Sequence, residues 1–386
     1  MNPINLNIAG DLFLGRRLET IAINNPDTLF DNEIKKLFSG SDFNIVNLES
    51  PLTNAGDEYK ILKTGPNLKA APEVVGVLKS INTTLVTLAN NHSYDFGDKG
   101  IMDTLEICKI NNIGTVGAAL SLKEASDIFY KKIGEINIAV VNIAENEWGN
   151  ANDKHGGANP MNIVANIKSI RDAKSKADIV ILIIHGGHEY YNYPSPRMIE
   201  QYRFYAQEGA SAIICHHSHC ISGYEIFEDV PIFYGLGNFL FDAETSSNGW
   251  YEGMLVNLQI NSQKKIAWDI YLYKQCRENL RVELLTGIEK SLIEDQIIAI
   301  NSVISNPTEL KKKFNELVES QRKYVLSMFS TAYFLNYKYL RSAIRKFGLE
   351  RFFLRRSQLK SILNYSRCEA HKDITFEVLI NYLKNK

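Results

Sequence analysis

The residues best suited to chemistry are three histidines within four positions, His216, His217 and His219, directly after the apolar run 213–215. On an extended or sharply turning backbone, the rings of His217 and His219 can face one point. Neutral imidazole is the commonest metal ligand in proteins, so imidazoles clustered at the end of a strand predict a metal or catalytic site. The alternative interpretation is a polar surface loop that is rich in histidine.

Four other apolar runs also end in side chains that can bind a metal. Residues 4–9 lead to Asp11, residues 42–48 to Glu49, residues 83–89 to Asn91 and His92, and residues 178–184 to His185. Each residue alone has a simpler explanation, since an Asp after a strand is usually a turn residue or a helix cap. Those explanations do not account for the presence of such residues after five successive strands. This recurrence predicts one shared site at the carboxyl ends of the strands.

This donor set combines hard carboxylate and amide oxygens with borderline imidazole nitrogens. Such a mixture suits Mn²⁺, Zn²⁺ or Fe²⁺ and is poor for Ca²⁺. The donors suffice for two ions with one carboxylate bridging them, and ions about 3.5–4 Å apart can bind a phosphoryl group and activate water. We therefore expect one or two divalent ions.

Alternating strands and helices must position these residues. Helical spacing is found over residues 18–24, 72–80, 101–111, 163–176 and 199–208. Further strands are expected over 136–143 and over 231–239, the second of which ends in a tight glycine turn. This alternation predicts an α/β fold. Short alternating strands follow over 251–285, and helical patterns over 288–305, 308–336 and 376–384. The pattern predicts one domain over 1–287 and a helical extension over 288–386.

Length and charge restrict the class of protein. The 386 residues exceed the ~250–300 at which a single core usually stops growing. The net charge of −1 gives no general attraction to nucleic acid, and no nucleic-acid partner is expected. Residues 284–386 nevertheless hold 18 Lys and Arg against 10 Asp and Glu. The basic aromatic segment 341–356 could lie on an anionic membrane surface, and the alternatives are a partner-binding helical bundle or a solvated face.

Cysteine usage and the start of the chain predict a cytoplasmic location, either free or peripheral to the membrane. The five cysteines are odd in number and form no CxxC pair, which favours reduced thiols. Cys215 and Cys220 flank the histidine cluster, and we interpret them as buried small apolar residues in preference to ligands. Residues 1–5 resemble no signal peptide, and the sequence contains no run of eighteen apolar residues.

Six short motifs occur in a recognisable order. They are Gly10-Asp11, Asn47-Leu48-Glu49, Asn90-Asn91-His92-x-x-Asp95-x-Gly97, His185-x-Gly187-x-Glu189-Tyr190, His216-His217-Ser218-His219 and Gly237-Asn238-Phe239. The set resembles the CapA family of capsule-biosynthesis proteins, which is linked to poly-γ-glutamate and belongs to the calcineurin-like metallophosphoesterase superfamily. The resemblance covers residues 4–275 and implies a four-layer α/β/β/α sandwich.

The resemblance also implies roles for individual residues. The implied metal ligands are Asp11, Glu49, Asn91, His185, His217 and His219, with Glu49 in the bridging position. His92 would be the general acid, with Asp95 and Glu189 as further catalytic residues. Arg16, Arg17, Tyr190 and Asn238 would bind substrate. The alternatives are a solvated surface pair for the two arginines and cover for a sheet edge for Tyr190, Tyr191 and Tyr193.

Two positions depart from the superfamily pattern. Phe13 occupies the place of a usual histidine, and Glu49 replaces a usual aspartate. We therefore expect one tight and one weak metal site.

The function expected from the resemblance is a metal-dependent hydrolase in capsule, poly-γ-glutamate or surface-polymer biosynthesis. It would hydrolyse a phosphoester by metal-bound hydroxide and act on an anionic polymer or phosphoester. One alternative is metal-dependent formation or cleavage of an amide bond on a glutamate-type polymer or glycan. Another is a non-catalytic component that assembles a capsule machine, which the basic tail could contact.

Overall fold

Two β-sheets packed face to face form the centre of the molecule. The computed structural model describes residues 3–243, 249–330, 346 and 355–384. The first sheet has the order β16-β15-β14-β1-β2-β3-β4, with β13 also paired to β1. Its strands are β1 (Ile4–Phe13), β2 (Phe43–Leu48), β3 (Leu85–Thr87), β4 (Gly114–Val116), β13 (Asn238–Phe241), β14 (Glu252–Ile260), β15 (Ile266–Gln275) and β16 (Val282–Leu284).

The second sheet has the order β11-β12-β10-β9-β7-β6. Its strands are β6 (Phe129–Ile133), β7 (Ile136–Ala144), β9 (Ile179–His185), β10 (Ala212–His216), β11 (Tyr224–Phe227) and β12 (Val230–Phe233). A separate small ladder joins β5 (Ala118–Ala119) to β8 (Gly157–Ala158).

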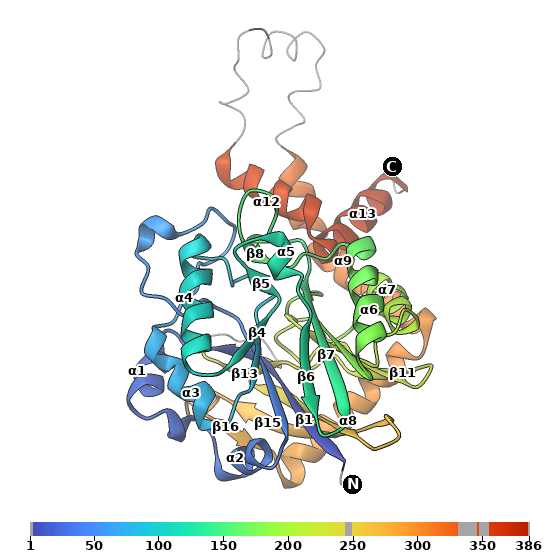
Figure 1. Ribbon diagram of the computed structural model, residues 1–386. Coiled ribbons are helices and arrows are strands. Elements are labelled where there is room, and N and C mark those ends of the chain that lie inside the picture. The colour runs from blue at the N-terminus through green and yellow to red at the C-terminus, as the bar shows by residue number, and fades with distance from the viewer. Residues whose placement is uncertain (1–2, 244–248, 331–345, 347–354, 385–386) are drawn as a thin grey trace.

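The helices are α1 (Arg17–Asn24), α2 (Asn32–Ser39), α3 (Val75–Ser80), α4 (Gly97–Ile110), α5 (Leu122–Ala125), α6 (Ile163–Lys176), α7 (Pro196–Gln207), α8 (Gly287–Ile304), α9 (Pro307–Ser330), α12 (Arg356–Arg367) and α13 (Glu369–Lys384). Helices α1 to α4 cover the outer face of the first sheet, and α6 and α7 cover that of the second (Figure 1). The 3₁₀ turns are η1 (Pro26–Leu29), η2 (Asp57–Tyr59) and η3 (Pro72–Val74).

The side chains of β9 explain the layering. Ile179, Ile181 and Ile183 join the core between the sheets, whereas Val180 and the alternate residues that follow it face α6 and α7. Because successive side chains of a strand point to opposite faces, this wholly apolar run is buried on both sides. A further apolar layer separates the first sheet from α1, α2, α3 and α4. The predicted four-layer α/β/β/α sandwich is thereby confirmed.

One predicted strand is wrong. Residues 231–239 form two strands, β12 and β13, that belong to different sheets. Gly237 lies between them with a positive φ of 75°, and a Cβ atom there would lie 2.7 Å from the carbonyl oxygen of Glu252. The predicted glycine turn is present, but it carries the chain from one sheet to the other, a change that the sequence pattern does not reveal.

Helices α9, α12 and α13 lie toward the top of the view in Figure 1, whereas α8 lies near the bottom. Helix α8 packs on the sandwich through Ile297, Ile300 and Ile304, while α9, α12 and α13 share an apolar cluster of their own around Phe314 and Val378. Within the described ranges, no helix combines the length and apolar composition needed to cross a bilayer. The division at residue 287 stays a prediction.

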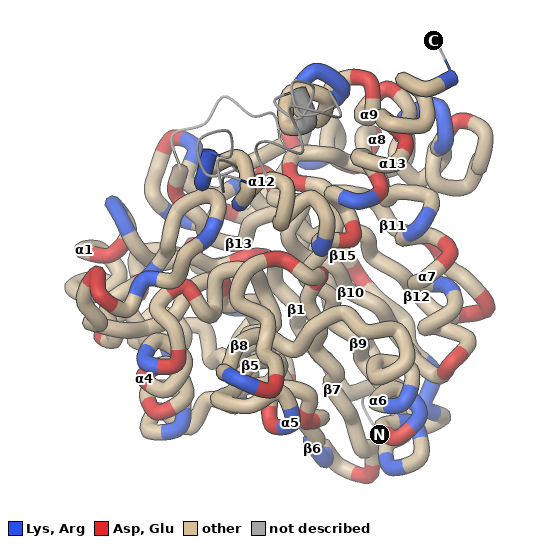
Figure 2. Tube along the Cα trace, turned by 90° about the horizontal axis from the view of Figure 1, so that it is seen from above, with Lys and Arg blue, Asp and Glu red and all other residues tan. Residues whose placement is uncertain are grey.

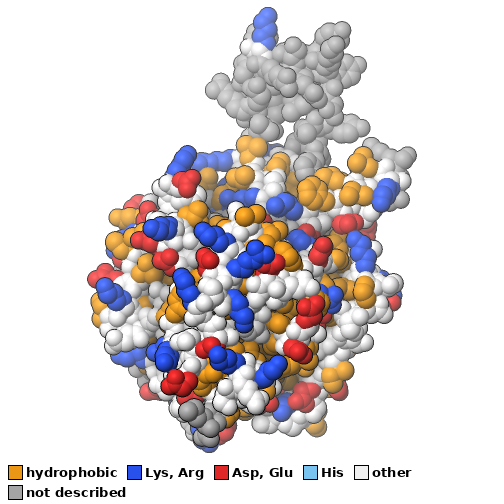
Figure 3. Space-filling view, turned by 45° about the vertical axis from the view of Figure 1, so that its right-hand side comes forward, with side chains coloured by type: hydrophobic (Ala, Val, Ile, Leu, Met, Phe, Trp, Pro, Cys, Tyr) orange, Lys and Arg blue, Asp and Glu red, His pale blue; other side chains and the backbone are white. Residues whose placement is uncertain are grey.

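Charges of both signs are interspersed along the described chain (Figure 2) and on the face shown in Figure 3. Exposed apolar side chains of α12 and α13 include Leu359, Leu363, Phe376, Ile380 and Leu383. The basic segment 341–356 lies outside the described residues, except for Lys346, Arg355 and Arg356.

Candidate metal centre

The ends of five strands converge from the two sheets. Strands β1, β2 and β3 run parallel in one sheet, and β9 and β10 run parallel in the other. Asp11 lies beside an irregularity in β1, Glu49 directly follows β2, and His185 is the last residue of β9. His217 and His219 follow β10 with positive φ angles of 87° and 54°. Such angles are uncommon for residues with a side chain and indicate a constrained turn.

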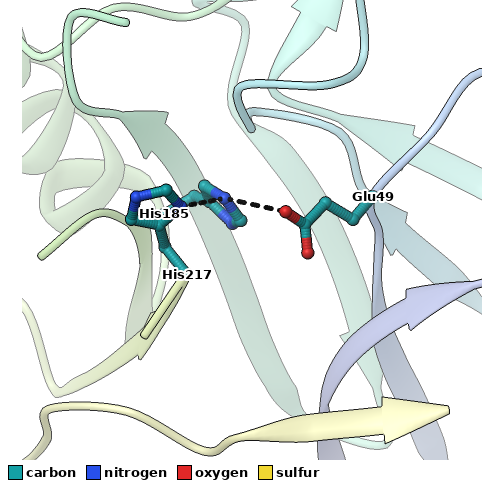
Figure 4. Close-up of side chains that lie close together, drawn as sticks. All are labelled: Glu49, His185 and His217. Carbon is teal, nitrogen blue, oxygen red and sulfur yellow. Dashed lines mark hydrogen bonds and ion pairs between the residues drawn. The ribbon is translucent and has the colours of Figure 1, made fainter. Parts of the chain in front are cut away.

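Glu49 belongs to two groups of side chains that could each hold a metal ion. One group is Glu49, His185 and His217, and the other is Asp11, Glu49 and His219. The ligand atoms of each group lie within 4.8 Å of one another. Figure 4 shows the first group, in which Glu49 Oε1 lies 3.6 Å from His185 Nε2. Glu49 Oε1 also lies 3.8 Å from His219 Nε2, so this carboxylate is placed to bridge two ions.

The surroundings of the Glu49 carboxylate fit a divalent cation. Both of its oxygens are buried, and neither has a hydrogen-bond partner among the described residues. Burial and then the nearby Asp11 carboxylate raise the pKa of Glu49 well above its usual range. A buried carboxylate without partners is costly unless a cation or a proton compensates it. The donor set thus fits Mn²⁺, Zn²⁺ or Fe²⁺, as the sequence predicts.

Asn91 completes the first group. Its Oδ1 atom lies 3.1 Å from His185 Nε2, beside the ring nitrogen that faces Glu49. The structure therefore brings together all six predicted ligands: Asp11, Glu49, Asn91, His185, His217 and His219.

Neighbouring polar groups orient these ligands. Asn47 Nδ2 donates a hydrogen bond of 2.7 Å to Asp11 Oδ1. Asn238 Oδ1 lies 2.9 Å from His219 Nδ1 and so fixes that ring, which leaves Nε2 toward Glu49. Partners of this kind fix the tautomer and direction of a metal-binding histidine. Asn238, which was predicted to bind substrate, thus lies against the His219 ring on the side that faces away from Glu49.

Glu147 supports His217 in the same way and was missed by the sequence argument. Its Oε1 atom lies 3.5 Å from His217 Nε2, while His217 Nδ1 lies 3.1 Å from His185 Nε2. Burial opposes charge on both partners, yet their mutual attraction lowers the pKa of Glu147 and raises the pKa of His217 to about 9. The sequence marks Glu147 only weakly, because this residue lies in a polar loop after β7 and belongs to no distinctive motif.

His92 is held by a buried charged pair. Asp95 Oδ2 lies 2.7 Å from His92 Nδ1, and Asp95 Oδ1 accepts a hydrogen bond of 2.6 Å from Lys63 Nζ. Lys63 also donates to the backbone oxygen of Asn91 at 2.9 Å. Sequence reasoning missed Lys63, since it lies in the long loop before α3 and has no local motif.

The electrostatic effect of Lys63 reaches His92. Burial lowers the pKa of His92, and the Lys63 ammonium lowers it further. A neutral ring that donates its Nδ1 hydrogen to Asp95 presents Nε2 as an acceptor. His92 can donate a proton from Nε2 only when a negative charge nearby favours the imidazolium.

A cavity of 440 Å³ adjoins the centre and has walls from both parts of the chain. The sandwich contributes residues that include Lys63, Asn91, His92, Glu147, Glu189, Tyr190 and His217, and the C-terminal helices contribute residues that include Gln321, Tyr324, Asn364, Tyr365 and His371. Glu189 and Tyr190 therefore lie where a substrate could contact them. The C-terminal helices form the roof of this cavity.

The two arginines predicted to bind substrate are not among the described residues that line this cavity. Arg17 pairs with Asp242 through contacts of 2.8 and 2.5 Å, and Arg16 lies 5.7 Å from the centre of the Phe13 ring. Phe13 itself is buried against Phe241 and Trp250, so an aromatic cluster occupies the place of the usual histidine.

The fold and these residues define a four-layer α/β/β/α protein with a candidate metal centre between its sheets. Residues 5–243 match the model of the bacterial capsule synthesis protein PGA_cap family, and the chain belongs to that family. This confirms the predicted resemblance to CapA proteins.

The names of two curated relatives both contain CapA. The chain is similar to "PGA biosynthesis protein CapA" of Bacillus subtilis, with 34% identity over 64% of this chain and 64% of the relative. It is also similar to "Capsule biosynthesis protein CapA" of Bacillus anthracis, with 29% identity over 83% of this chain and 80% of the relative. The match thus spans just under two thirds of the length of the Bacillus subtilis protein.

Proposed function

We propose that this chain is a metal-dependent phosphoester hydrolase that acts in the biosynthesis of a capsule or of a poly-γ-glutamate-type polymer. One observation carries the catalytic part. The buried Glu49 carboxylate, without a hydrogen-bond partner among the described residues, lies between His185 and His219 at 3.6 and 3.8 Å. Divalent cations held there would supply Lewis-acid activation of a phosphoryl group and of water.

The protein's own residues would bind and orient the substrate in the cavity. A phosphoryl anion beside His92 would favour its imidazolium form, and Asp95 would hold the ring so that Nε2 faces the leaving oxygen. Lys63 would add positive charge behind His92. Glu189 and Tyr190, exposed at the cavity wall, would contact the part of the substrate beyond the phosphoryl group.

The names of the relatives support the polymer part of the proposal. The Bacillus proteins are named for biosynthesis of PGA and of a capsule. An anionic polymer end or its phosphorylated precursor is therefore the substrate class we propose, with Mn²⁺, Zn²⁺ or Fe²⁺ as the metal. Contact of segment 341–356 with a membrane or with capsule machinery, and a cytoplasmic location, stay predictions.

Paired activity assays would test the reaction. The purified chain, loaded with Mn²⁺, is assayed on an aryl phosphomonoester and diester and, separately, on a γ-glutamyl anilide. We expect phosphoester turnover that Glu49→Gln abolishes and that the surface variant Glu106→Gln leaves unchanged. If the chain binds metal but cleaves only the anilide, its reaction is amide hydrolysis and the phosphoester proposal is wrong. A folded chain that binds no metal would favour a non-catalytic assembly role.

A further inference from the structure

A further group of side chains that could hold a metal ion lies where the C-terminal helices meet the sandwich. Glu147, in the loop after β7, comes together with Cys368 and His371, and one ligand atom from each lies within 4.8 Å of the others. Cys368 is fully buried and immediately precedes α13, while His371 lies in its first turn. The spacing Cys-x-x-His brings both side chains to the same end of the helix.

We propose that Glu147, Cys368 and His371 form a zinc site that fastens the C-terminal helices over the cavity and that adjoins the Glu49 centre through the contact between Glu147 and His217. Thiolate, imidazole and carboxylate are the three side-chain ligands of Zn²⁺ in proteins. The Glu49 centre offers only oxygen and nitrogen donors, so the thiolate makes the new site the softer of the two.

The contacts around the three residues point their donor atoms together. Cys368 Sγ lies 3.8 Å from Glu147 Oε1, a separation close to that between two ligands of one tetrahedral ion. The His371 ring stacks on Tyr365, with 4.3 Å between ring centres, and its Nδ1 atom lies 3.4 Å from Asn364 Nδ2. The Oδ1 atom of this amide has no partner among the described residues. With the amide turned so that Oδ1 accepts a hydrogen bond from Nδ1, the Nε2 atom carries no hydrogen and can bind a metal.

The cavity can supply the fourth ligand. Glu147 and His371 both line it, so water there can complete the coordination of the ion. Zinc binding replaces the thiol proton of Cys368, which leaves to solvent, and forms one Zn–S bond. Among the described residues, no other cysteine belongs to a group able to hold a metal.

Hydrogen bonds between α13 and the sandwich fix the N-terminal end of this helix. Glu369 accepts hydrogen bonds from Asn146 N and Nδ2 at 2.8 and 2.7 Å. Asp373 accepts one from Arg197 Nε at 2.8 Å, and Ala370 N donates to Glu145 Oε2 at 3.1 Å. Because the helix is already fixed on both sides of His371, the zinc ligands are preorganised and pay little ordering entropy on binding.

Cobalt substitution would test the proposal with a signal that only a sulfur ligand gives. The full chain is stripped with a chelator and titrated with Co²⁺, and the thiolate-to-cobalt charge-transfer absorption is recorded. We expect this band in the wild type, its disappearance on adding Zn²⁺, and its loss in Cys368→Ser. The band should persist in Cys108→Ser, a matched buried cysteine on α4, and in Glu49→Gln, which disables only the other centre.

Two results would overturn the proposal: a folded wild type without the band at excess Co²⁺, or a band that survives in Cys368→Ser. If Cys368→Ser does not fold, His371→Gln decides the question, since losing a ligand should weaken Co²⁺ binding at this band by at least about tenfold. Unchanged affinity in His371→Gln would also overturn it.

Discussion

Asn238 Oδ1 lies 2.9 Å from Nδ1 of His219, and this contact turns the opposite ring nitrogen toward Glu49. The two residues come from different sheets: His219 follows β10, and Asn238 begins β13. The switch of the chain between sheets at Gly237 therefore places the side chain that orients the candidate metal ligand His219.

Loss of that orienting contact should weaken metal binding. Removing such a partner typically costs 10–100-fold in metal affinity, so Asn238→Ala should weaken Mn²⁺ binding by about that factor in calorimetric titration. Asn238→Asp keeps the acceptor oxygen and should restore much of the affinity. The exposed Asn137→Ala is the control, and an affinity within twofold of wild type in Asn238→Ala would show that His219 needs no such support.

Lys63 should control the protonation of His92. Its ammonium lowers the pKa of His92, so Lys63→Met should raise that pKa, as measured by NMR titration of the ring protons. Lys63→Arg keeps the charge and should leave the pKa nearly unchanged. A His92 pKa that stays constant or falls in Lys63→Met would contradict this electrostatic role.

The same substitution should also destabilise the fold. Lys63→Met leaves the buried Asp95 carboxylate without its cation, which typically costs about 3–5 kcal/mol in free energy of unfolding. Chemical denaturation measures this loss. Lys60→Met, which removes only an exposed pair with Asp57, should cost far less.

Stabilisation by metal should grow with pH. The pKa of Glu49 is raised in the metal-free fold, so the folded state holds this proton more tightly than the unfolded chain does, and the group's contribution to stability falls as pH rises above about 4.5. A cation replaces that proton. The difference in melting temperature between Mn²⁺-loaded and chelated protein should therefore increase from pH 5 to pH 8. A constant or shrinking difference would argue against Glu49 as a ligand.

The two ions should bind with unequal affinity. Phe13 fills the position of a usual histidine with a buried ring, so the neighbouring site lacks one nitrogen donor. Titration with Mn²⁺, which disfavours thiolate ligands, should give one tight and one weak step. Phe13→His should tighten the weak step by about tenfold or more, and two equal steps in the wild type would refute the prediction.

The candidate ligands at the strand ends could be predicted because the residue types in the local sequence mark where each strand stops. In β2, β9 and β10, an apolar β-branched run stops at a carboxylate or an imidazole, and parallel strands bring such ends to one edge. Asp11 is the exception in detail, since it lies within β1 instead of following it. The set of candidate ligands that the structure brings together could therefore be predicted without any knowledge of long-range packing.

The supporting residues could not be predicted, because they depend on tertiary contacts. Lys63 reaches Asp95 across 32 positions, Asn238 reaches His219 only after the chain changes sheets, and Cys368 reaches Glu147 across 221 positions. Neither a hydrophobic period nor a short motif encodes such distances. For the same reason the sequence assigned Asn238 to the substrate and left Lys63 and Glu147 unassigned.

The central claim is that Glu49 binds and bridges metal ions between the two sheets. Crystals grown with Zn²⁺ and measured on both sides of the zinc absorption edge test it most directly. We predict anomalous density about 2.0–2.2 Å from a Glu49 carboxylate oxygen, shared with His185 and His217 or with Asp11 and His219, and absent from crystals of Glu49→Gln. Wild-type crystals in millimolar Zn²⁺ without density at coordination distance from Glu49 would contradict the claim.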